Sequence, residues 1–244
     1  MTTTKPAASA VEASKVYGAN SETVRALDGV TVEFASGEFS AIMGPSGSGK
    51  STLMHCMAGL DTLSSGSVFL DGTDMSRLTE RQLTNIRRRN IGFVFQSFNL
   101  IPTLSAYENI VLPDLLDGKS PDKEWVNKVI AAVGMEERLT HRPSELSGGQ
   151  QQRVAVARAL SSRPAVVFAD EPTGNLDSAT GSEILNFMRK AVDEMGQTII
   201  MVTHDPVAAS YADRIVFLAD GKVAGELRNP DPDTVLDYMK SIRR

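Results

Sequence analysis

Two patterns of apolar residues divide this chain of 244 residues. Residues 11–16, 24–27 and 30–34 alternate between apolar and polar positions or carry β-branched side chains, which predicts antiparallel strands. Later runs are mostly apolar without alternation, which predicts parallel strands buried on both faces. The pattern therefore predicts an α/β fold with a parallel sheet and an N-terminal antiparallel β subdomain. The later runs cover residues 39–43, 91–95, 166–169 and 198–203.

Segments that favour helix fall between these strands. Residues 52–60 are typical of a buried helix, residues 76–89 are charged and helix-prone, and residues 151–160 are rich in strong helix formers. From residue 97 the strand pattern is lost and prolines interrupt the chain, which predicts a helical subdomain at about residues 97–162, inserted in the α/β core.

The two ends of the chain differ in pattern. Residues 1–10 are polar and lack an apolar core, which predicts a disordered tail rather than a signal peptide. Residues 215–218 and 222–226 predict a hairpin around Asp220 and Gly221. A closing helix is expected at residues 235–242, inside a C-terminal segment at 229–244, so the principal domain spans residues 11–228.

Residues 44–51 match G-x-x-x-x-G-K-[ST], a pattern that binds the phosphates of nucleotides. Its glycines let the backbone approach an anion, toward which the N–H groups of the following helix point. Lys50 supplies positive charge for the β- and γ-phosphates, and the Ser51 hydroxyl can bind Mg²⁺. A Gly/Ser-rich turn without a ligand is the alternative, and the flanking strand and helix argue against it. The predicted nucleotide-binding residues here are Gly44, Pro45, Ser46, Gly47, Ser48, Gly49, Lys50, Ser51 and Thr52.

Two acidic residues, Asp170 and Glu171, follow the apolar residues 166–169. A central parallel strand would deliver them at its carboxyl end. We interpret Asp170 as a Mg²⁺ ligand and Glu171 as the base that orients and deprotonates an attacking water. A strand followed by a polar turn is the ordinary alternative, and the phosphate loop upstream favours the catalytic interpretation.

The segment formed by Ser147, Gly148, Gly149 and Gln150 precedes a predicted helix. Ser147 can cap that helix, and the N-terminal N–H groups of the helix offer a second site for an anion. From the spacing alone, a well-capped helix without a ligand is the favoured interpretation.

The chain resembles the nucleotide-binding subunit of an ATP-binding cassette (ABC) transporter. The resemblance rests on three motifs in their order along the chain, which are the phosphate loop, residues 146–150 and residues 166–171, and it runs from about residue 11 to 228. The resemblance implies an ATPase domain that binds ATP and Mg²⁺ as a homodimer. Residues 147–150 of one chain would close over the γ-phosphate held by the phosphate loop of the other. It also implies a separate transmembrane permease in two copies, and a location at the cytoplasmic face of the cell membrane.

The same resemblance assigns roles to isolated positions. Gln96 corresponds to a glutamine that touches Mg²⁺ and senses the membrane partner, and His204 to a histidine that contacts the γ-phosphate. Tyr17 corresponds to the aromatic residue that stacks on adenine, and Asn175 and Asp177 to the loop through which the subunits communicate. A polar strand end or a core aromatic is the ordinary alternative for Gln96 and Tyr17. The predicted catalytic residues are thus Lys50, Glu171 and His204, and the predicted Mg²⁺ ligands are Ser51, Gln96 and Asp170.

Further segments are similar to the branch of this family that exports macrolides, lipoproteins or haem, with haem slightly favoured. Members of this branch pair with a four-helix membrane subunit. Phe98 or Leu100 is expected to anchor a helix of that partner, unless both fill the subdomain's own core. A non-transporting cell-division ATPase of the same branch, which regulates cell-wall hydrolysis, is the alternative function. The similar segments are residues 59–61, 65–66, 87–92, 95–102 and 174–177.

Composition narrows these possibilities. A net charge of −5 and a pI near 5.3 argue against nucleic acid as a partner. The single cysteine, Cys56, excludes a disulfide framework. No apolar run approaches the roughly 20 residues that span a bilayer, so a transport pathway is expected in another chain. His55 and His141 have no catalytic setting in the sequence and are assigned to the core or the surface.

Overall fold

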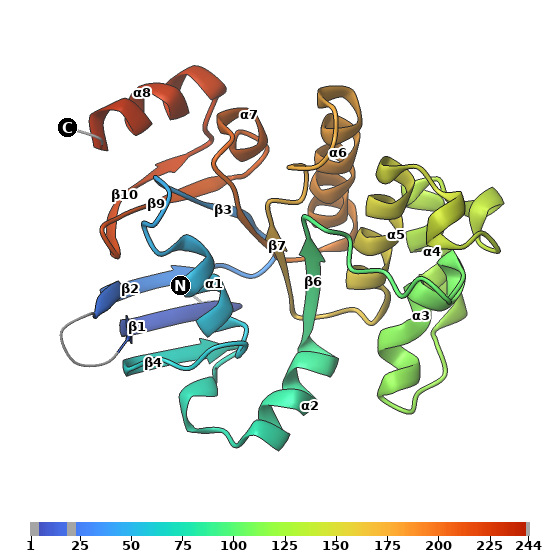
Figure 1. The fold of residues 1–244 in the computed structure, drawn as a ribbon, viewed down its shortest axis with the longest axis horizontal. Coiled ribbons are helices and arrows are strands. Elements are labelled where there is room, and N and C mark those ends of the chain that lie inside the picture. The colour runs from blue at the N-terminus through green and yellow to red at the C-terminus, as the bar shows by residue number, and fades with distance from the viewer. Residues whose placement is uncertain (1–4, 19–22, 243–244) are drawn as a thin grey trace.

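The structure, a computed structural model, describes residues 5–18 and 23–242 (Figure 1). Its central sheet has six strands in the order β10-β9-β3-β8-β7-β6. The strands from β9 to β6 are parallel, and β10 pairs antiparallel with β9. The predicted parallel strands and the terminal hairpin are therefore confirmed. The six strands are β3 (Phe39–Met43), β6 (Ile91–Phe95), β7 (Val166–Asp170), β8 (Ile199–Val202), β9 (Arg214–Ala219) and β10 (Lys222–Arg228).

A second sheet is antiparallel, with the strand order β2-β1-β4-β5. The two strands predicted at residues 24–27 and 30–34 form one continuous strand, in which Gly29 takes a φ of 69° where the pairing with β1 shifts register. The four strands are β1 (Ala8–Tyr17), β2 (Val24–Phe34), β4 (Ser65–Leu70) and β5 (Thr73–Asp74).

The prediction of a disordered tail at residues 1–10 is wrong for its last part. Residues 8–10 belong to β1, and Ala8 and Ala10 are fully buried. Ala8 lies opposite Phe34 on one side and Leu70 on the other. The small side chains of residues 8–10 do not predict a strand. These residues form one because they pair with β2 on one side and β4 on the other. Residues 1–4 lie outside the described residues.

Eight α-helices lie within the described residues. The helix expected at residues 76–89 begins at Glu80, because Thr79 caps it and forms a capping box with Gln82. The helix α6 was not predicted; its first turn contains Ser, Thr and Gly, which favour helix weakly. The helices are α1 (Lys50–Met57), α2 (Glu80–Asn90), α3 (Ala106–Leu116), α4 (Lys123–Val133), α5 (Gly148–Ser161), α6 (Ser178–Met195), α7 (Pro206–Ala209) and α8 (Pro232–Ile242), with 3₁₀ turns at Met75–Arg77, Glu136–Arg138 and Pro143–Glu145.

The segment between β6 and β7 holds α3, α4 and α5, which lie together on the side of β6 away from the antiparallel sheet (Figure 1). Trp125 of α4 donates its indole N–H to the Leu160 carbonyl oxygen of α5 at 2.9 Å. The apolar side chains of these helices join the same core as one face of the central sheet. The predicted insertion of helices into the α/β core is confirmed, and its bounds at residues 97–162 remain a prediction. Helix α8 lies within the predicted C-terminal segment, of which residues 243–244 are outside the described residues.

Each parallel strand sends alternate side chains into two cores. Met43 of β3 and Ala169 of β7 enter the core shared with α3 to α6, whereas Ile42 and Phe168 enter the core shared with α1 and the antiparallel sheet. Burial on both faces explains why these strands are apolar along most of their length. Among the described residues, no helix combines the length and the apolar character that crossing a membrane requires.

Cys56 of α1 is 1% exposed, and burial raises the pKa of its thiol to about 12. We expect a chromogenic disulfide reagent at pH 8 to label the folded chain about a hundredfold or more slowly than the chain unfolded in guanidinium, because little thiolate forms in the core. Absorbance of the released thiol measures both rates. Equal rates would contradict the burial of Cys56.

Candidate functional site

The carboxyl ends of β3, β8 and β7 meet at one edge of the central sheet, because these strands are parallel neighbours. The predicted phosphate loop, residues 44–52, follows β3. Strand β7 ends at Asp170 and is followed by Glu171, and β8 is followed by Thr203 and His204. Segments far apart in the sequence thus converge on one site.

The backbone of the phosphate loop passes too close to other strands to carry side chains at two positions. A Cβ atom on Gly44 would lie 2.1 Å from the Leu218 carbonyl oxygen, and one on Gly49 would lie 2.3 Å from the Ala26 carbonyl oxygen. Gly49 also has a φ of 96°, which disfavours other residues. A Cβ atom on Gly47 would meet nothing within 4 Å. Strands β9 and β2 therefore shape the loop, and the space beside Gly47 stays open.

Two features of the loop fit a bound anion. Helix α1 begins after Gly49 without a side-chain cap, so its first N–H groups can donate to an anion. The Ser48 hydroxyl is buried and has no hydrogen-bond partner among the described residues. These donors fit the phosphates of a nucleotide, as the sequence predicts.

The ammonium group of Lys50 lies folded over its own loop. It donates to the carbonyl oxygens of Gly44 and Pro45, at 2.9 and 2.8 Å. Burial lowers the pKa of Lys50, while the negative charges of Glu171 and Asp170 oppose this shift. A phosphate above the loop would give this cation a stronger partner than two neutral carbonyls.

Ser51 and Asp170 form a pair of oxygen donors beside the loop. The Ser51 hydroxyl donates to Asp170 Oδ1 at 3.4 Å. Burial is the main cause that raises the pKa of Asp170, and the charge of Glu171 adds to it. Within the described residues, no three His, Cys, Asp or Glu side chains gather as they would in an all-protein metal site. A hydroxyl and a carboxylate fit Mg²⁺, which typically binds one or two protein ligands together with substrate phosphates.

His55 is a residue of this site that the sequence analysis missed. Its Nε2 lies 4.0 Å from Asp170 Oδ2. His55 follows Ser51 by four residues on α1, so both side chains lie on the helix face toward Asp170. This spacing was the available signal in the sequence.

Glu171 adopts a left-handed backbone conformation, with a φ of 47° directly after β7. Its Oε1 lies 2.7 Å from His204 Nδ1, and its Oε2 accepts a hydrogen bond from the Thr203 hydroxyl at 3.2 Å. Two residues that follow β8 therefore orient the carboxylate. Such an oriented carboxylate at the edge of the phosphate loop can accept a proton from water.

Gln96 makes no hydrogen bond to Ser51 or Asp170 within the described part of the chain. Its side-chain amide donates to Asn175 Oδ1 at 3.0 Å, and the Asn175 amide donates to the Gln96 carbonyl oxygen at 2.9 Å. Gly174 permits this contact, because a Cβ atom there would lie 2.8 Å from Gln96 Nε2. The role of Gln96 as a Mg²⁺ ligand remains a prediction.

Residues 147–150 form the start of α5. Ser147 Oγ accepts from the Gln150 N–H at 3.3 Å, and Gln150 Oε1 accepts from the Ser147 N–H at 2.9 Å, which is a capping box. A Cβ atom on Gly149 would lie 2.4 Å from Thr180 Cγ2, whereas one on Gly148 would make only ordinary contacts. Across residues 5–18 and 23–242, this segment makes no hydrogen bond to the phosphate loop of its own chain.

Tyr17 and Asp177, two further predicted nucleotide-binding residues, are held by residues of their own chain. The Tyr17 hydroxyl donates to Asp61 Oδ2 at 2.6 Å, and Tyr17 is 41% exposed. Asp177 caps α6 by accepting from the N–H groups of Ala179 and Thr180, at 3.1 and 3.0 Å. Hydrogen bonds, first that of the Thr180 N–H, lower the pKa of Asp177. Contacts of both residues with a nucleotide remain predictions.

The chain is similar to known proteins over most of its length. Residues 27–174 match the family model described as ABC transporter. The chain is 42% identical over 233 residues to the bacitracin export ATP-binding protein BceA of Halalkalibacterium halodurans, covering 94% of this chain and 91% of that protein. It is 44% identical over 222 residues to the macrolide export ATP-binding/permease protein MacB of Chlorobaculum tepidum, covering 91% of this chain and 34% of that protein.

A solved structure supports the same relationship. The ATP-binding cassette MJ0796 of Methanocaldococcus jannaschii, a dimer in a post-hydrolysis state bound to ADP and Pi, matches with a TM-score of 0.82 and 41% identity. The match covers 92% of this chain and 99% of that chain.

This chain belongs to the ABC transporter family, and it is an ATP-binding ATPase of that family. It is related to the ATPases of the MacB and BceA type. The predicted fold class, family and ATPase activity are thereby confirmed.

We expect Glu171→Gln to bind ATP with Mg²⁺ but to hydrolyse it at least about a hundredfold more slowly, because an amide cannot accept the proton of water. Phosphate release at saturating ATP measures the rate, and calorimetry measures the affinity. Lys50→Ala is the contrasting variant, which should fail earlier by losing ATP affinity. Hydrolysis by Glu171→Gln at the parental rate would show that Glu171 is not the base.

Proposed function

We propose that this chain is the ATPase subunit of a membrane exporter and acts as a homodimer on a separate permease. The observation that carries the proposal is that residues 147–150, exposed in part at the start of α5, make no hydrogen bond to the phosphate loop of their own chain within the described residues. In a two-chain arrangement, the N-terminal end of α5 can face the γ-phosphate above the other chain's phosphate loop. The dimeric MJ0796 cassette bound to ADP and Pi supports this arrangement.

In the proposed dimer, each chain contributes the same groups to hydrolysis. Lys50 and the loop N–H groups bind the phosphates, and Ser51 and Asp170 would hold Mg²⁺, which neutralises phosphate charge when bound. Glu171 accepts a proton from the attacking water. His204 binds Glu171 through Nδ1, and its side chain is 75% exposed, so its other ring nitrogen can face the γ-phosphate.

The names of two relatives support export as the process that ATP drives. One relative is named as a bacitracin export ATP-binding protein and the other as a macrolide export ATP-binding/permease protein. The chain covers 91% of the former, which is named as an ATP-binding protein, and we propose by analogy that the permease is a separate chain, present in two copies in the cell membrane. The ATPase would then lie at the cytoplasmic face of that membrane. The cargo is haem, a drug, a peptide or a lipoprotein, with haem favoured by the similar segments of the sequence.

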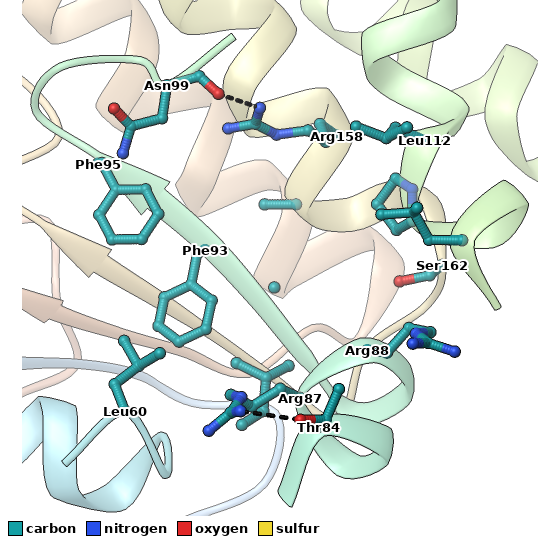
Figure 2. A pocket seen from close by; sticks show the side chains of 15 residues that line it. Leu60, Thr84, Arg87, Arg88, Phe93, Phe95, Asn99, Leu112, Arg158 and Ser162 are labelled. Atoms are coloured by element: carbon teal, nitrogen blue, oxygen red, sulfur yellow. Dashed lines mark hydrogen bonds between the residues drawn. The ribbon is translucent and has the colours of Figure 1, made fainter. Parts of the chain in front are cut away.

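The proposed permease contact is a groove with a volume of 510 Å³ (Figure 2). Phe93 and Phe95 of β6 face it with stacked rings, whose centroids are 5.4 Å apart. Arg158 lies toward one end of the groove, and Arg87 and Arg88 lie toward the other. An apolar floor between cations fits an amphipathic helix that carries acidic residues.

The expected anchors, Phe98 and Leu100, do not line this groove. Leu100 packs against the core, and the Phe98 ring lies near Gly148, where a Cβ atom would be 3.7 Å from Phe98 Cζ. The apolar lining comes instead from β6 and from α3, which contributes Leu112 and Leu116. The loop after Gln96 therefore borders the groove without supplying its apolar floor.

Arg158 connects the groove to the nucleotide site. Its guanidinium donates to the carbonyl oxygens of Asn99 and Phe98, at 2.6 and 2.9 Å. Both residues have left-handed φ angles, of 50° and 59°, which are costly for residues with side chains. This strained loop follows Gln96, whose amide is bonded to Asn175. A partner helix that moves Arg158 would thus act on residues 98–99 and, through Gln96, on Asn175, which lies in the loop through which the two subunits are predicted to communicate.

Gly148→Asp is expected to prevent ATP-driven dimerisation while the chain stays folded. The Cβ atom has room, and an acidic residue in the first turn of α5 favours the helix, yet its carboxylate would repel the partner's γ-phosphate. Light scattering with MgATP, in chains that also carry Glu171→Gln, measures the dimer. Gly148→Ala is the matched control and should dimerise.

Position 148 gives a sharper test than position 149, where the clash with Thr180 would disturb the chain itself. Mixing Gly148→Asp with Lys50→Ala chains should restore part of the ATPase activity, because one site of the mixed dimer is intact. Full dimerisation of Gly148→Asp at parental ATP affinity would contradict the shared site.

Leu116→Glu tests the groove. Leu116 lines the groove and is 62% exposed, whereas its neighbour Leu115 is 53% exposed and does not line it. We expect Leu116→Glu to weaken binding of the detergent-solubilised permease by about 30-fold, as loss of a hot spot of ~2 kcal/mol would. Leu115→Glu is the matched control and should bind normally. Melting temperature and ATP affinity should be unchanged in both variants, and equal permease binding by both would refute the groove.

A further inference from the structure

Lys15, Tyr17 and Asp61 form a cluster that the proposed hydrolysis does not use. Asp61 Oδ1 accepts a hydrogen bond from Lys15 Nζ, and Asp61 Oδ2 accepts one from the Tyr17 hydroxyl, both at 2.6 Å. Lys15 Nζ also donates to the Thr62 carbonyl oxygen at 2.6 Å, and the Thr62 N–H donates to Asp61 Oδ1 at 2.7 Å. Both oxygens of the carboxylate are therefore occupied, and the Tyr17 hydroxyl is held at a defined point.

Lys15 covers one face of the Tyr17 ring. Its Nζ lies 4.8 Å from the ring centroid, a cation–π contact. The Lys15 side chain is only 11% exposed, while Tyr17 is 41% exposed. Because the Lys15 ammonium covers one face of the Tyr17 ring, the exposed area of Tyr17 comes from its other face and its edge. A planar base can stack on the uncovered face alone.

Lys15 and Asp61 each stabilise the charged form of the other. Burial by itself would lower the pKa of Lys15. The hydrogen bond to Asp61 and the negative charge of Asp61 outweigh burial, so the pKa of Lys15 is raised. Burial would raise the pKa of Asp61, and the hydrogen bonds from Lys15 and Tyr17 outweigh it and lower that pKa. Burial and the bond to Asp61 both raise the pKa of Tyr17. The cation, the carboxylate and the neutral phenol are therefore all present at neutral pH.

Helix α1 links this cluster to the phosphate loop. Lys50 of the loop begins the helix, and the N–H groups of Leu60 and Asp61 donate to the carbonyl oxygen of His55 in its last turn, at 2.8 and 3.3 Å. Asp61 is thus attached to the far end of the helix that carries the loop. The Tyr17 ring, bonded to Asp61, is held at a defined distance from the phosphate site.

We propose that Asp61 and Lys15 are positioning residues that hold the Tyr17 ring so that one face is ready to stack on the base of the bound nucleotide. The inference rests on the proposed ATPase function and on the stacking of Tyr17 on adenine that the family resemblance predicts. A ring that is already ordered loses less rotamer freedom on binding, so the pair contributes to nucleotide affinity. It acts through the base and leaves the phosphate contacts unchanged.

Two probes separate the base from the phosphates. Calorimetry with ATP reports on both, and calorimetry with inorganic tripolyphosphate reports on the phosphate loop alone. Tyr17→Ala, which removes the ring, should raise the Kd for ATP by about tenfold or more. Tyr17→Phe keeps the ring and the Lys15–Asp61 pair but frees the ring from Asp61, and should raise the Kd by about threefold. The Kd for tripolyphosphate should stay unchanged in both variants.

A double-mutant cycle tests whether Asp61 acts through Tyr17. Asp61→Asn should raise the Kd and the KM for ATP by about threefold with little change in kcat, and adding Tyr17→Phe should raise them no further. Melting temperatures accompany every variant, since Asp61→Asn weakens the partner of a buried lysine. If Asp61→Asn fails to fold, Tyr17→Phe alone still decides the question.

The outcomes separate two failures. If Tyr17→Ala binds ATP as tightly as the parent, stacking on Tyr17 itself is refuted. If Tyr17→Ala weakens ATP binding but Tyr17→Phe does not, stacking stands and positioning by Asp61 is overturned. A weaker affinity of Tyr17→Phe for tripolyphosphate, or independent effects in the cycle, would likewise overturn the positioning role.

Discussion

Parallel pairing of β3, β8 and β7 is the constraint on which both the fold and the nucleotide site depend. Ile42 pairs with Val202, and Val202 pairs with Asp170, so the segments that follow these strands emerge side by side. A shift of one strand by one residue would exchange Phe168 and Ala169 between the two cores. The cores therefore determine the register, and the register places the phosphate loop, the carboxylates and the histidine. The geometry of the site follows from the packing of buried side chains beneath it.

Several charged side chains gather at this edge of the sheet, and the protein's own opposite charges do not fully stabilise them. Burial raises the pKa of Asp170 and lowers that of Lys50, so both charged forms are disfavoured where they stand. Glu171 is held beside them in a left-handed conformation. A triphosphate with Mg²⁺ carries the complementary charges and would stabilise both ionised groups. The charges of Asp170 and Lys50, which the protein does not fully stabilise by itself, thus fit a site for a highly charged ligand.

The groove and helix α5 are closely packed against each other. Strand β6 packs so closely on α5 that a Cβ atom on Gly92 would lie 2.2 Å from the Ala159 carbonyl oxygen. Arg158, one residue earlier on α5, bonds the strained loop after Gln96. A force on the groove from the proposed permease would therefore reach residues 147–150 and the Gln96 loop together. In the proposed dimer this couples the permease to both halves of a shared site.

The sequence by itself predicted the features that depend on consecutive residues. The phosphate loop needs glycines, a lysine and a hydroxyl at close spacing. The pair Asp170 and Glu171 directly follows an apolar run, and the phosphate loop upstream favours its catalytic interpretation. Local backbone geometry and residue type determine such features, so a pattern can reveal them. The strands buried on both faces were predicted for the same reason, since their burial appears in every residue of the run.

Only the tertiary structure decided which distant residues meet. His55 lies beside Asp170, Asp61 holds Tyr17, and Phe93 rather than Phe98 faces the groove. Residues 8–10 join a strand because two other strands pair with them, although their own side chains give no strand pattern. Each of these outcomes depends on contacts between residues far apart along the chain. Periodicity and propensity describe neighbours in sequence, and they do not encode which surfaces pack together once the two cores have formed.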